Sequence, residues 1–247
     1  MNISILNQYK SECREALDCI ANLSKCFEKV FMDTMQLYMS IPDRINFLQL
    51  GRYGKFSEQT YRNNFEKDDF DWFSFNSHLA SKILSGKRKA IAIDPSYITK
   101  SGHKTPWIGY FWSGVSGSMK RGLELLGIGL VDADNKDCVA LEAVQTPDTV
   151  TLDNLNKNLV EWYVAVLESM KGKLQALTKN IVADAFFSKE TFVTPMLNAG
   201  FTVISRLRND SVLFYPTTKE RTGKRGRPFV YDGKIDFSNL DLSRCEQ

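Results

Sequence analysis

Apolar residues recur at steps of three and four along residues 6–41, and this spacing predicts helical structure over the stretch. Pro42 cannot lie inside a continuing helix, so it marks the end of that pattern. Residues 43–50 and 58–67 repeat the helical spacing, and the glycines of residues 51–54 supply a turn between them. Two short helices joined by a glycine-containing turn predict a helix-turn-helix.

The second of these short helices carries polar side chains suited to DNA. Gln59, Arg62 and Asn63 offer the donors and acceptors that a recognition helix uses on base edges. Tyr61 and Phe65, four positions apart, are predicted to pack inward. The same pattern also fits a small helical bundle with a polar outer face, and the pattern alone does not separate the two interpretations.

Short apolar runs separated by turns follow the helices and predict a sheet. The acidic and aromatic residues 68–75 are expected to connect the two parts and to pack on the second. Strands are predicted at Ala90–Asp94, Arg121–Val131, Asp137–Val144, a run ending at Asp184, and Phe201–Ser205; helices are predicted at Thr151–Lys171 and Ser188–Ala199. This order gives a mixed sheet with helices packed on it.

Aspartates close two of the predicted strands. Asp94 follows the apolar run 90–93 and precedes Pro95, and Asp184 ends the run 180–183. Carboxylates at the ends of core strands suit Mg²⁺, a hard cation that prefers oxygen ligands, and Mn²⁺ is a possible substitute. Two such ions can activate a water or a 3′ hydroxyl during phosphodiester cleavage. Asp94 is predicted to bridge both ions and Asp184 to hold one of them.

Composition narrows the class of protein. Hydrophobic residues make up 43% of the 247 residues and charged residues 25%, which indicates a globular chain. No apolar run reaches the roughly 18 to 20 residues of a membrane span, and residues 1–9 lack a signal-peptide pattern, so the cytoplasm is the expected compartment. The five cysteines form no Cys-x-x-Cys pair, so they are expected to be reduced and structural rather than zinc ligands.

The net charge of +3 does not identify a polyanion-binding protein by itself, but the basic residues are clustered. Lys100, His103 and Lys104 lie in a polar turn after the first predicted strand, where they can contact phosphates. Residues 107–112 then bring an aromatic cluster. These rings can stack on an unpaired base near a reacting strand end, or they can pack one loop against the sheet, and we favour packing.

A second basic cluster lies near the C-terminal end, within a segment predicted to be an insertion at residues 216–234. Lys224, Arg225 and Arg227 surround Gly226 and precede Pro228, which matches the core of an AT-hook. In that motif an extended Arg-Gly-Arg-Pro enters the minor groove of A·T-rich DNA. The alternative is a solvated basic loop. Residues 231–234 are predicted to form the turn of a hairpin.

Several segments together resemble a known family. Residues 91–96, 109–114, 182–189 and 204–208 are similar to the DDE-type transposases of bacterial insertion sequences, whose catalytic domain has a ribonuclease H-like fold. The likeness extends to residues 49–54 and 226–228.

The resemblance implies an α/β fold with a ribonuclease H-like mixed sheet and flanking helices, preceded by a small all-helical region. It divides the chain into a helical DNA-binding region at residues 1–85 and a catalytic domain at residues 86–247. The implied activity is Mg²⁺-dependent DNA strand cleavage and transfer at the ends of an insertion sequence. The implied partners are double-stranded DNA and, during synapsis, a second copy of the chain. The first two metal-binding acids of the family carry over onto Asp94 and Asp184.

The third acid of the family does not carry over. It is normally a glutamate on a helix that also holds a tyrosine and an arginine, and we expect that helix to lie beyond Gln247. The alternative function is therefore a truncated, catalytically inactive DNA-binding remnant or a regulator of transposition. An aspartyl-phosphate phosphotransferase with Asp94 as nucleophile is disfavoured, because such enzymes place a second aspartate where this chain has Ser96.

Overall fold

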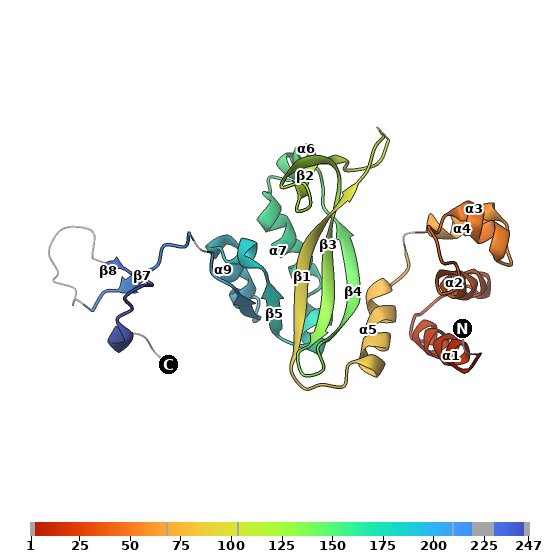
Figure 1. Ribbon diagram of the computed structural model, residues 1–247, viewed down its shortest axis with the longest axis horizontal. Coiled ribbons are helices and arrows are strands. Elements are labelled where there is room, and N and C mark those ends of the chain that lie inside the picture. The colour runs from red at the N-terminus through yellow and green to blue at the C-terminus, as the bar shows by residue number, and fades with distance from the viewer. Residues whose placement is uncertain (1–2, 68, 103, 209, 219–229, 245–247) are drawn as a thin grey trace. The chain divides into compact units, whose positions relative to one another are not determined.

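The computed structural model divides into two compact units, residues 1–205 and 206–247, which are described separately (Figure 1). The predicted boundary at residue 85 falls inside the first unit and stays a prediction. None of the helices in the described part of the chain is long and apolar enough to cross a bilayer. The described residues are 3–67, 69–102, 104–208, 210–218 and 230–244.

The centre of the first unit is a six-stranded sheet with the order β2-β3-β1-β5-β6, in which β4 also pairs with β3. Strands β1 and β3 are antiparallel, whereas β1, β5 and β6 run parallel to one another. This mixed sheet with helices packed on it confirms the predicted ribonuclease H-like α/β fold. The strands are β1 Lys89–Thr99, β2 Gly109–Ser113, β3 Ser118–Asp132, β4 Asp137–Gln145, β5 Asn180–Ala183 and β6 Thr202–Ser205.

The two faces of the sheet differ in burial. On β1, Ile91 and Ile93 are buried, while Ala92 is partly exposed and Asp94 is exposed. Helices α5 (Trp72–Ile83), α7 (Leu159–Ser169) and α9 (Glu190–Asn198) add their apolar side chains to the core of Ile91 and Ile93. In Figure 1, α7 lies behind the sheet, whose other face is turned to the viewer. We call the face that carries Asp94 the open face.

Four helices precede the sheet: α1 Ile3–Asp18, α2 Lys25–Tyr38, α3 Phe47–Tyr53 and α4 Glu58–Phe65. The helical pattern predicted over residues 6–41 is broken once, because Asn22 has a φ of 64° and the Ser24 side chain caps α2. Helices α3 and α4 are two short helices joined by a turn, but the first spans Phe47–Tyr53 rather than residues 43–50, so the turn begins at Gly54. The helix-turn-helix stays a prediction.

A buried polar contact holds the turn between α3 and α4 against α2. The Tyr61 hydroxyl donates a hydrogen bond to Asp33 Oδ2, and the Lys55 backbone N–H donates to the same oxygen at 2.9 Å. Asp33 and Tyr61 are 7% and 0% exposed. Burial and the bond to Asp33 raise the pKa of Tyr61 to about 12. The orientation of α4 therefore depends on this contact.

Two predicted segments need correction. Residues 68–75 are not only a connector, because Asp71 caps helix α5 by accepting from the Ser74 N–H at 3.0 Å. Phe73 packs on the sheet core as expected, whereas Phe70 and Phe75 pack against Phe31 and the N-terminal helices. The single helix predicted at Thr151–Lys171 is divided into α6 Thr149–Asn154, α7 and α8 Lys171–Leu177. The break arises because Asn158 and Glu161 form a capping box that starts α7 afresh.

The second unit contains β7 Phe214–Pro216 and β8 Tyr231–Lys234, which pair antiparallel, and the short 3₁₀ helix η2 Leu242–Arg244. Residues 231–234 are thus a strand rather than the predicted turn. The hairpin itself is present. Its connection includes residues 219–229, which lie outside the described residues.

Gly86, which precedes β1, packs closely against the buried side chain of Asp132. Its N–H donates to Asp132 Oδ2 at 2.7 Å, and Asp132 is fully buried and also accepts from the Asn135 side chain at 2.9 Å. A Cβ at position 86 would lie 2.0 Å from Asp132 Oδ1. We expect Gly86→Ala to lower the free energy of unfolding by about 2 kcal/mol, measured by urea denaturation. Gly114→Ala is the control, because its Cβ would meet nothing within 4 Å. Equal stability of the two variants would contradict this account.

Candidate active site

Asp94 and Asp184 occupy matching positions on neighbouring parallel strands. Ile93 lies opposite Ala183 in the pairing of β1 with β5, and each aspartate directly follows its member of that pair. The structure therefore brings the two predicted acids together. Asp94 does not end its strand, however, because residues 95–99 continue to pair with β3. The pairing of β1 with β5 ends at Ile93, as the prediction of a strand end at Asp94 requires, but the pairing of β1 with β3 does not.

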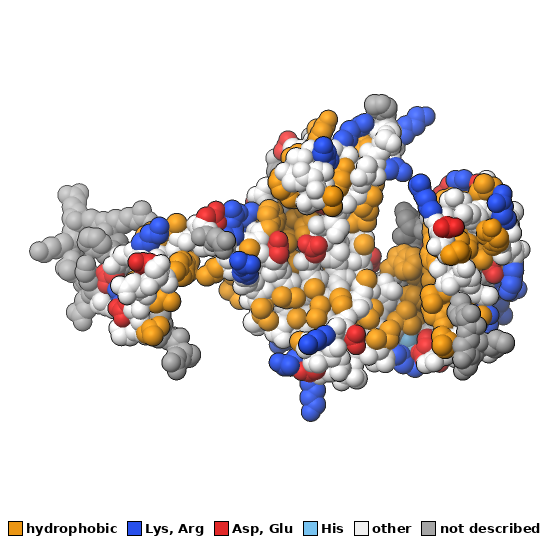
Figure 2. Space-filling view, in the orientation of Figure 1, with side chains coloured by type: hydrophobic (Ala, Val, Ile, Leu, Met, Phe, Trp, Pro, Cys, Tyr) orange, Lys and Arg blue, Asp and Glu red, His pale blue; other side chains and the backbone are white. Residues whose placement is uncertain are grey.

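The electrostatics of the pair favour a bound cation. Burial, together with the negative charge of Asp184, raises the pKa of the Asp94 carboxyl above its usual value. The Asp184 carboxylate is oriented locally, because its Oδ1 accepts from the Phe186 N–H at 3.0 Å and caps the 3₁₀ helix η1 Ala185–Phe187. A small group of acidic side chains is visible near the middle of the open face (Figure 2). Two carboxylates at one exposed place fit a hard divalent ion such as Mg²⁺, which commonly keeps several waters.

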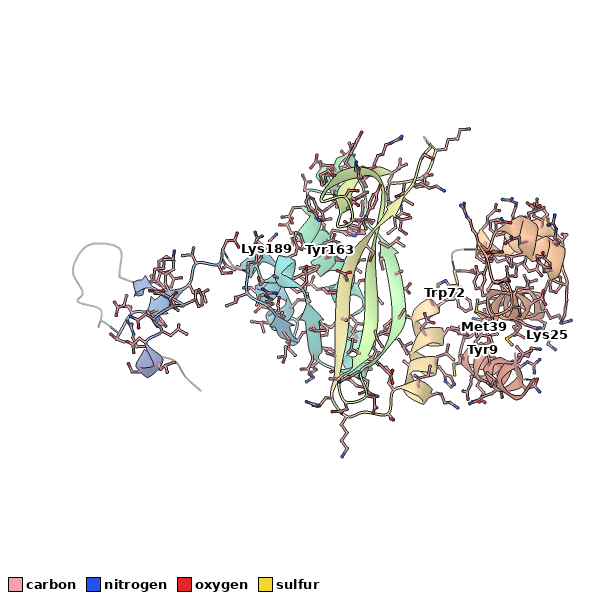
Figure 3. All side chains as sticks on the ribbon, in the orientation of Figure 1. Tyr9, Lys25, Met39, Trp72, Tyr163 and Lys189 are labelled. Atoms are coloured by element: carbon pink, nitrogen blue, oxygen red, sulfur yellow. The ribbon has the colours of Figure 1, made fainter. Side chains whose placement is uncertain are left out.

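Two acidic side chains form the candidate site in the described residues. Across the described ranges, no cluster of three or more His, Cys, Asp or Glu side chains is close enough to bind one metal ion. Glu124 lies on β3, the strand beside β1, but its side chain faces the core, where it is 5% exposed. Its Oε1 accepts a 2.5 Å hydrogen bond from the hydroxyl of Tyr163, which is labelled on α7 in Figure 3. Glu124 is thus a structural partner of α7.

The Glu124–Tyr163 bond is a feature that the sequence reasoning missed. Burial and the nearby carboxylates of Glu124 and Asp94 raise the pKa of Tyr163, so its hydroxyl stays protonated and continues to donate. The bond ties α7 to β3 beneath the acidic pair. No signal in the sequence pointed to this bond, because Glu124 is flanked by Leu123 and Leu125, and only the structure shows that Glu124 is the buried member of the alternation on β3.

The three predicted DNA contacts on α4 lie on one exposed face of that helix. Gln59 donates to Asn63 Oδ1 at 2.6 Å, and both side chains are exposed. Arg62 is paired with Glu58 at 2.6 Å and lies over the Phe47 ring at 4.7 Å from its centroid. The bond to Glu58 uses Nε and Nη2 of Arg62, so the guanidinium keeps N–H donors for a phosphate or base.

The remaining predicted contacts lie elsewhere in the chain. Lys100 and Lys104 are exposed in the segment between β1 and β2. Basic side chains gather over β2 and the loop that precedes it (Figure 2). His103 lies outside the described residues, as do Lys224, Arg225 and Arg227 of the AT-hook-like segment.

The aromatic residues between 107 and 112 differ in their exposure. Phe111 is 6% exposed, and Trp107 lies against Trp162 with ring centroids 6.3 Å apart, as packing predicts. Tyr110 and Trp112 instead expose 65% and 60% of their surface. The packing interpretation is wrong for these two rings, because β2 places alternate side chains on opposite faces.

A scan against family models matches residues 38–242 to the DDE superfamily endonuclease model. The chain belongs to this family of endonucleases. A search of curated proteins found no match. The family match supports a nuclease- or transposase-type activity with a nucleic-acid substrate, and nucleases of this superfamily typically use divalent metal ions.

Proposed function

We propose that this protein is a DDE-type transposase that cuts and transfers DNA strands at the ends of an insertion sequence. The observation that carries the proposal is the matched register of Asp94 and Asp184 on two parallel strands, at an exposed part of a ribonuclease H-like sheet. The family match over residues 38–242 supports the same class of activity.

Asp94 and Asp184 would hold Mg²⁺ or, in its place, Mn²⁺. When bound, such an ion activates a water or a 3′ hydroxyl and stabilises the leaving oxygen of the phosphodiester. The chain contributes fixed ligand positions. The pleat of β1 points the Asp94 side chain to the open face, and the cap on η1 holds the Asp184 carboxylate. Mutual repulsion between the carboxylates makes a cation between them favourable.

DNA recognition is proposed for several surfaces. Gln59, Arg62 and Asn63 on α4 would contact bases and phosphates of a duplex, and Lys100 with Lys104 would contact phosphates beside the sheet. His103 would join these two lysines. The AT-hook-like residues Lys224, Arg225 and Arg227 would enter a minor groove. A dimer would bring two element ends together.

A second candidate function is DNA binding without cleavage. It is favoured by one observation, that the described residues bring together two carboxylates rather than three. A protein of this kind would occupy the element ends and regulate transposition.

A nicking assay separates the two functions. The full chain is incubated with a supercoiled plasmid that carries the element's ends, in Mg²⁺, in Mn²⁺ or in EDTA. We expect nicked and linear products with either metal and none in EDTA. Binding to the ends by mobility shift without any nicking would overturn the transposase proposal and support the second function. Absence of both binding and nicking would contradict both.

A further inference from the structure

The hairpin of β2 and β3 exposes two large aromatic rings side by side. Tyr110 and Trp112 alternate on β2 with Phe111 and Ser113, which are 6% and 3% exposed. Tyr110 and Trp112 are therefore on the same face of β2, about 7 Å apart along the strand. Rings of this size are costly to leave in water, so an exposed pair suggests a ligand with flat apolar surfaces.

The pair lies on the open face of the sheet, the face that also carries Asp94. Tyr110 is opposite Arg121 on β3, and Trp112 is opposite Met119. Gly127, six residues beyond Arg121 on the same strand and therefore on the same face, is opposite Asp94. Six residues of strand span roughly 20 Å. That length corresponds to about six nucleotides of a stacked strand at ~3.4 Å each.

The surroundings of the two rings are positively charged. Residues 95–123 contain no Asp or Glu, but they contain Lys100, Lys104, Lys120 and Arg121. All four side chains are exposed, but Lys120 lies opposite Phe111 and is therefore on the other face of the hairpin from the two rings. Arg121 also donates to the Gly102 carbonyl at 2.8 Å, which attaches the loop before β2 to strand β3. This arrangement complements a polyanion that also carries aromatic bases.

We propose that Tyr110 and Trp112 form a stacking surface for unpaired bases of a single DNA strand that leads towards Asp94. Lys100, Lys104 and Arg121 would hold the phosphates of this strand. A duplex fits less well, because its base faces are already covered by neighbouring bases. The inference rests on the proposed function for the identity of the nucleic acid, and it adds a binding surface for a locally opened strand.

The test measures binding of a fluorescein-labelled 20-nucleotide oligo(dT) by anisotropy. EDTA is present throughout, so the result does not depend on cleavage. We expect Trp112→Ala and Tyr110→Ala each to weaken binding about 5- to 100-fold, in line with the cost of losing one stacked base. Trp112→Phe should recover most of the affinity. The control is Phe237→Ala, an aromatic side chain of similar exposure, 54%, in the second unit, and it should bind normally.

The outcomes separate this inference from the proposed function. Asp153→Asn, which removes an exposed carboxylate on α6 outside both proposed surfaces, should keep its affinity for oligo(dT). Unchanged binding by both Trp112→Ala and Tyr110→Ala would overturn the inference even if the Asp94 variant has lost cleavage. Loss of self-association in these variants, with unchanged oligo(dT) affinity, would identify the surface as a contact between copies and would also overturn it. Circular dichroism verifies that each variant is folded.

Discussion

Asp94→Asn is expected to reduce metal-dependent DNA nicking by roughly a thousandfold. The substitution keeps the shape of the side chain and removes the negative charge that a divalent ion requires. Transition-state stabilisation by a bound metal is worth several kcal/mol, and about 4 kcal/mol corresponds to this factor. Asp184→Asn should have an effect of similar size, because the two side chains follow matched positions on β1 and β5. The measurement is the initial rate of plasmid nicking in Mg²⁺.

Two controls make this prediction specific. Asp153→Asn removes an exposed carboxylate on α6 and should nick at the unmodified rate. Duplex binding by the Asp94 and Asp184 variants should be retained, since neither residue belongs to the proposed recognition surface of α4. Nicking by either variant within tenfold of the unmodified protein would refute its role as a metal ligand.

Gly54→Ala is expected to disrupt the predicted helix-turn-helix. An added Cβ would lie 1.9 Å from the Tyr61 hydroxyl oxygen and 2.8 Å from Asp33 Oδ2. It would also lie 2.7 Å from the Leu50 carbonyl oxygen. All three residues are buried, Tyr61 is bonded to Asp33, and the Leu50 carbonyl accepts from the Gly54 N–H, so they cannot all move aside. We expect a loss of about 3 kcal/mol in the free energy of unfolding, with weaker duplex binding, because overpacking and a broken buried hydrogen bond act together.

The measurements for Gly54→Ala are urea denaturation and a duplex mobility shift. Tyr61→Phe is the milder comparison. It removes the hydroxyl but leaves the Lys55 N–H as a donor to Asp33, so a smaller loss of about 1 kcal/mol is expected. If Gly54→Ala is as stable as the unmodified protein and binds duplex equally well, the Asp33–Tyr61 contact does not position α4.

The sequence predicts the elements that follow a regular period. The apolar runs of β1, β3 and β5 are clear without a structure, and so is helix α4 after its cap at Ser57. Strand β2 is missed because it is only five residues long and its aromatic side chains gave no clear alternation of apolar and polar types. Helix α5 is missed because its start lies in an acidic and aromatic run, and the sequence does not show that Asp71 of this run is the N-cap.

Pro95 explains the error in the end of β1. A proline after an apolar run indicates a strand end, because it lacks a backbone N–H. Here Pro95 still lies opposite Leu126, and β1 continues to Thr99 along β3. Local sequence cannot show this, since the length of β1 is set by its long antiparallel partner.

For the candidate site, too, the sequence predicts the residues but not their spatial arrangement. The two aspartates are predictable as residues, because each follows a buried run of similar length. Their shared register is not, since it depends on how the chain between them returns to the sheet. The exposure of Tyr110 and Trp112 likewise depends on which face the helices cover, and that is decided by packing far along the chain.

The central claim is that Asp94 and Asp184 jointly hold a divalent cation. This claim is tested by titrating the protein with Mn²⁺ in the absence of DNA and measuring the loss of the free-ion signal by electron paramagnetic resonance. The test does not depend on activity. Asp94→Asn and Asp184→Asn should each weaken Mn²⁺ binding at this site by at least tenfold, and the double substitution should weaken it little further, because the ligands act as one site. Mn²⁺ binding by the double variant that equals that of the unmodified protein would contradict the account.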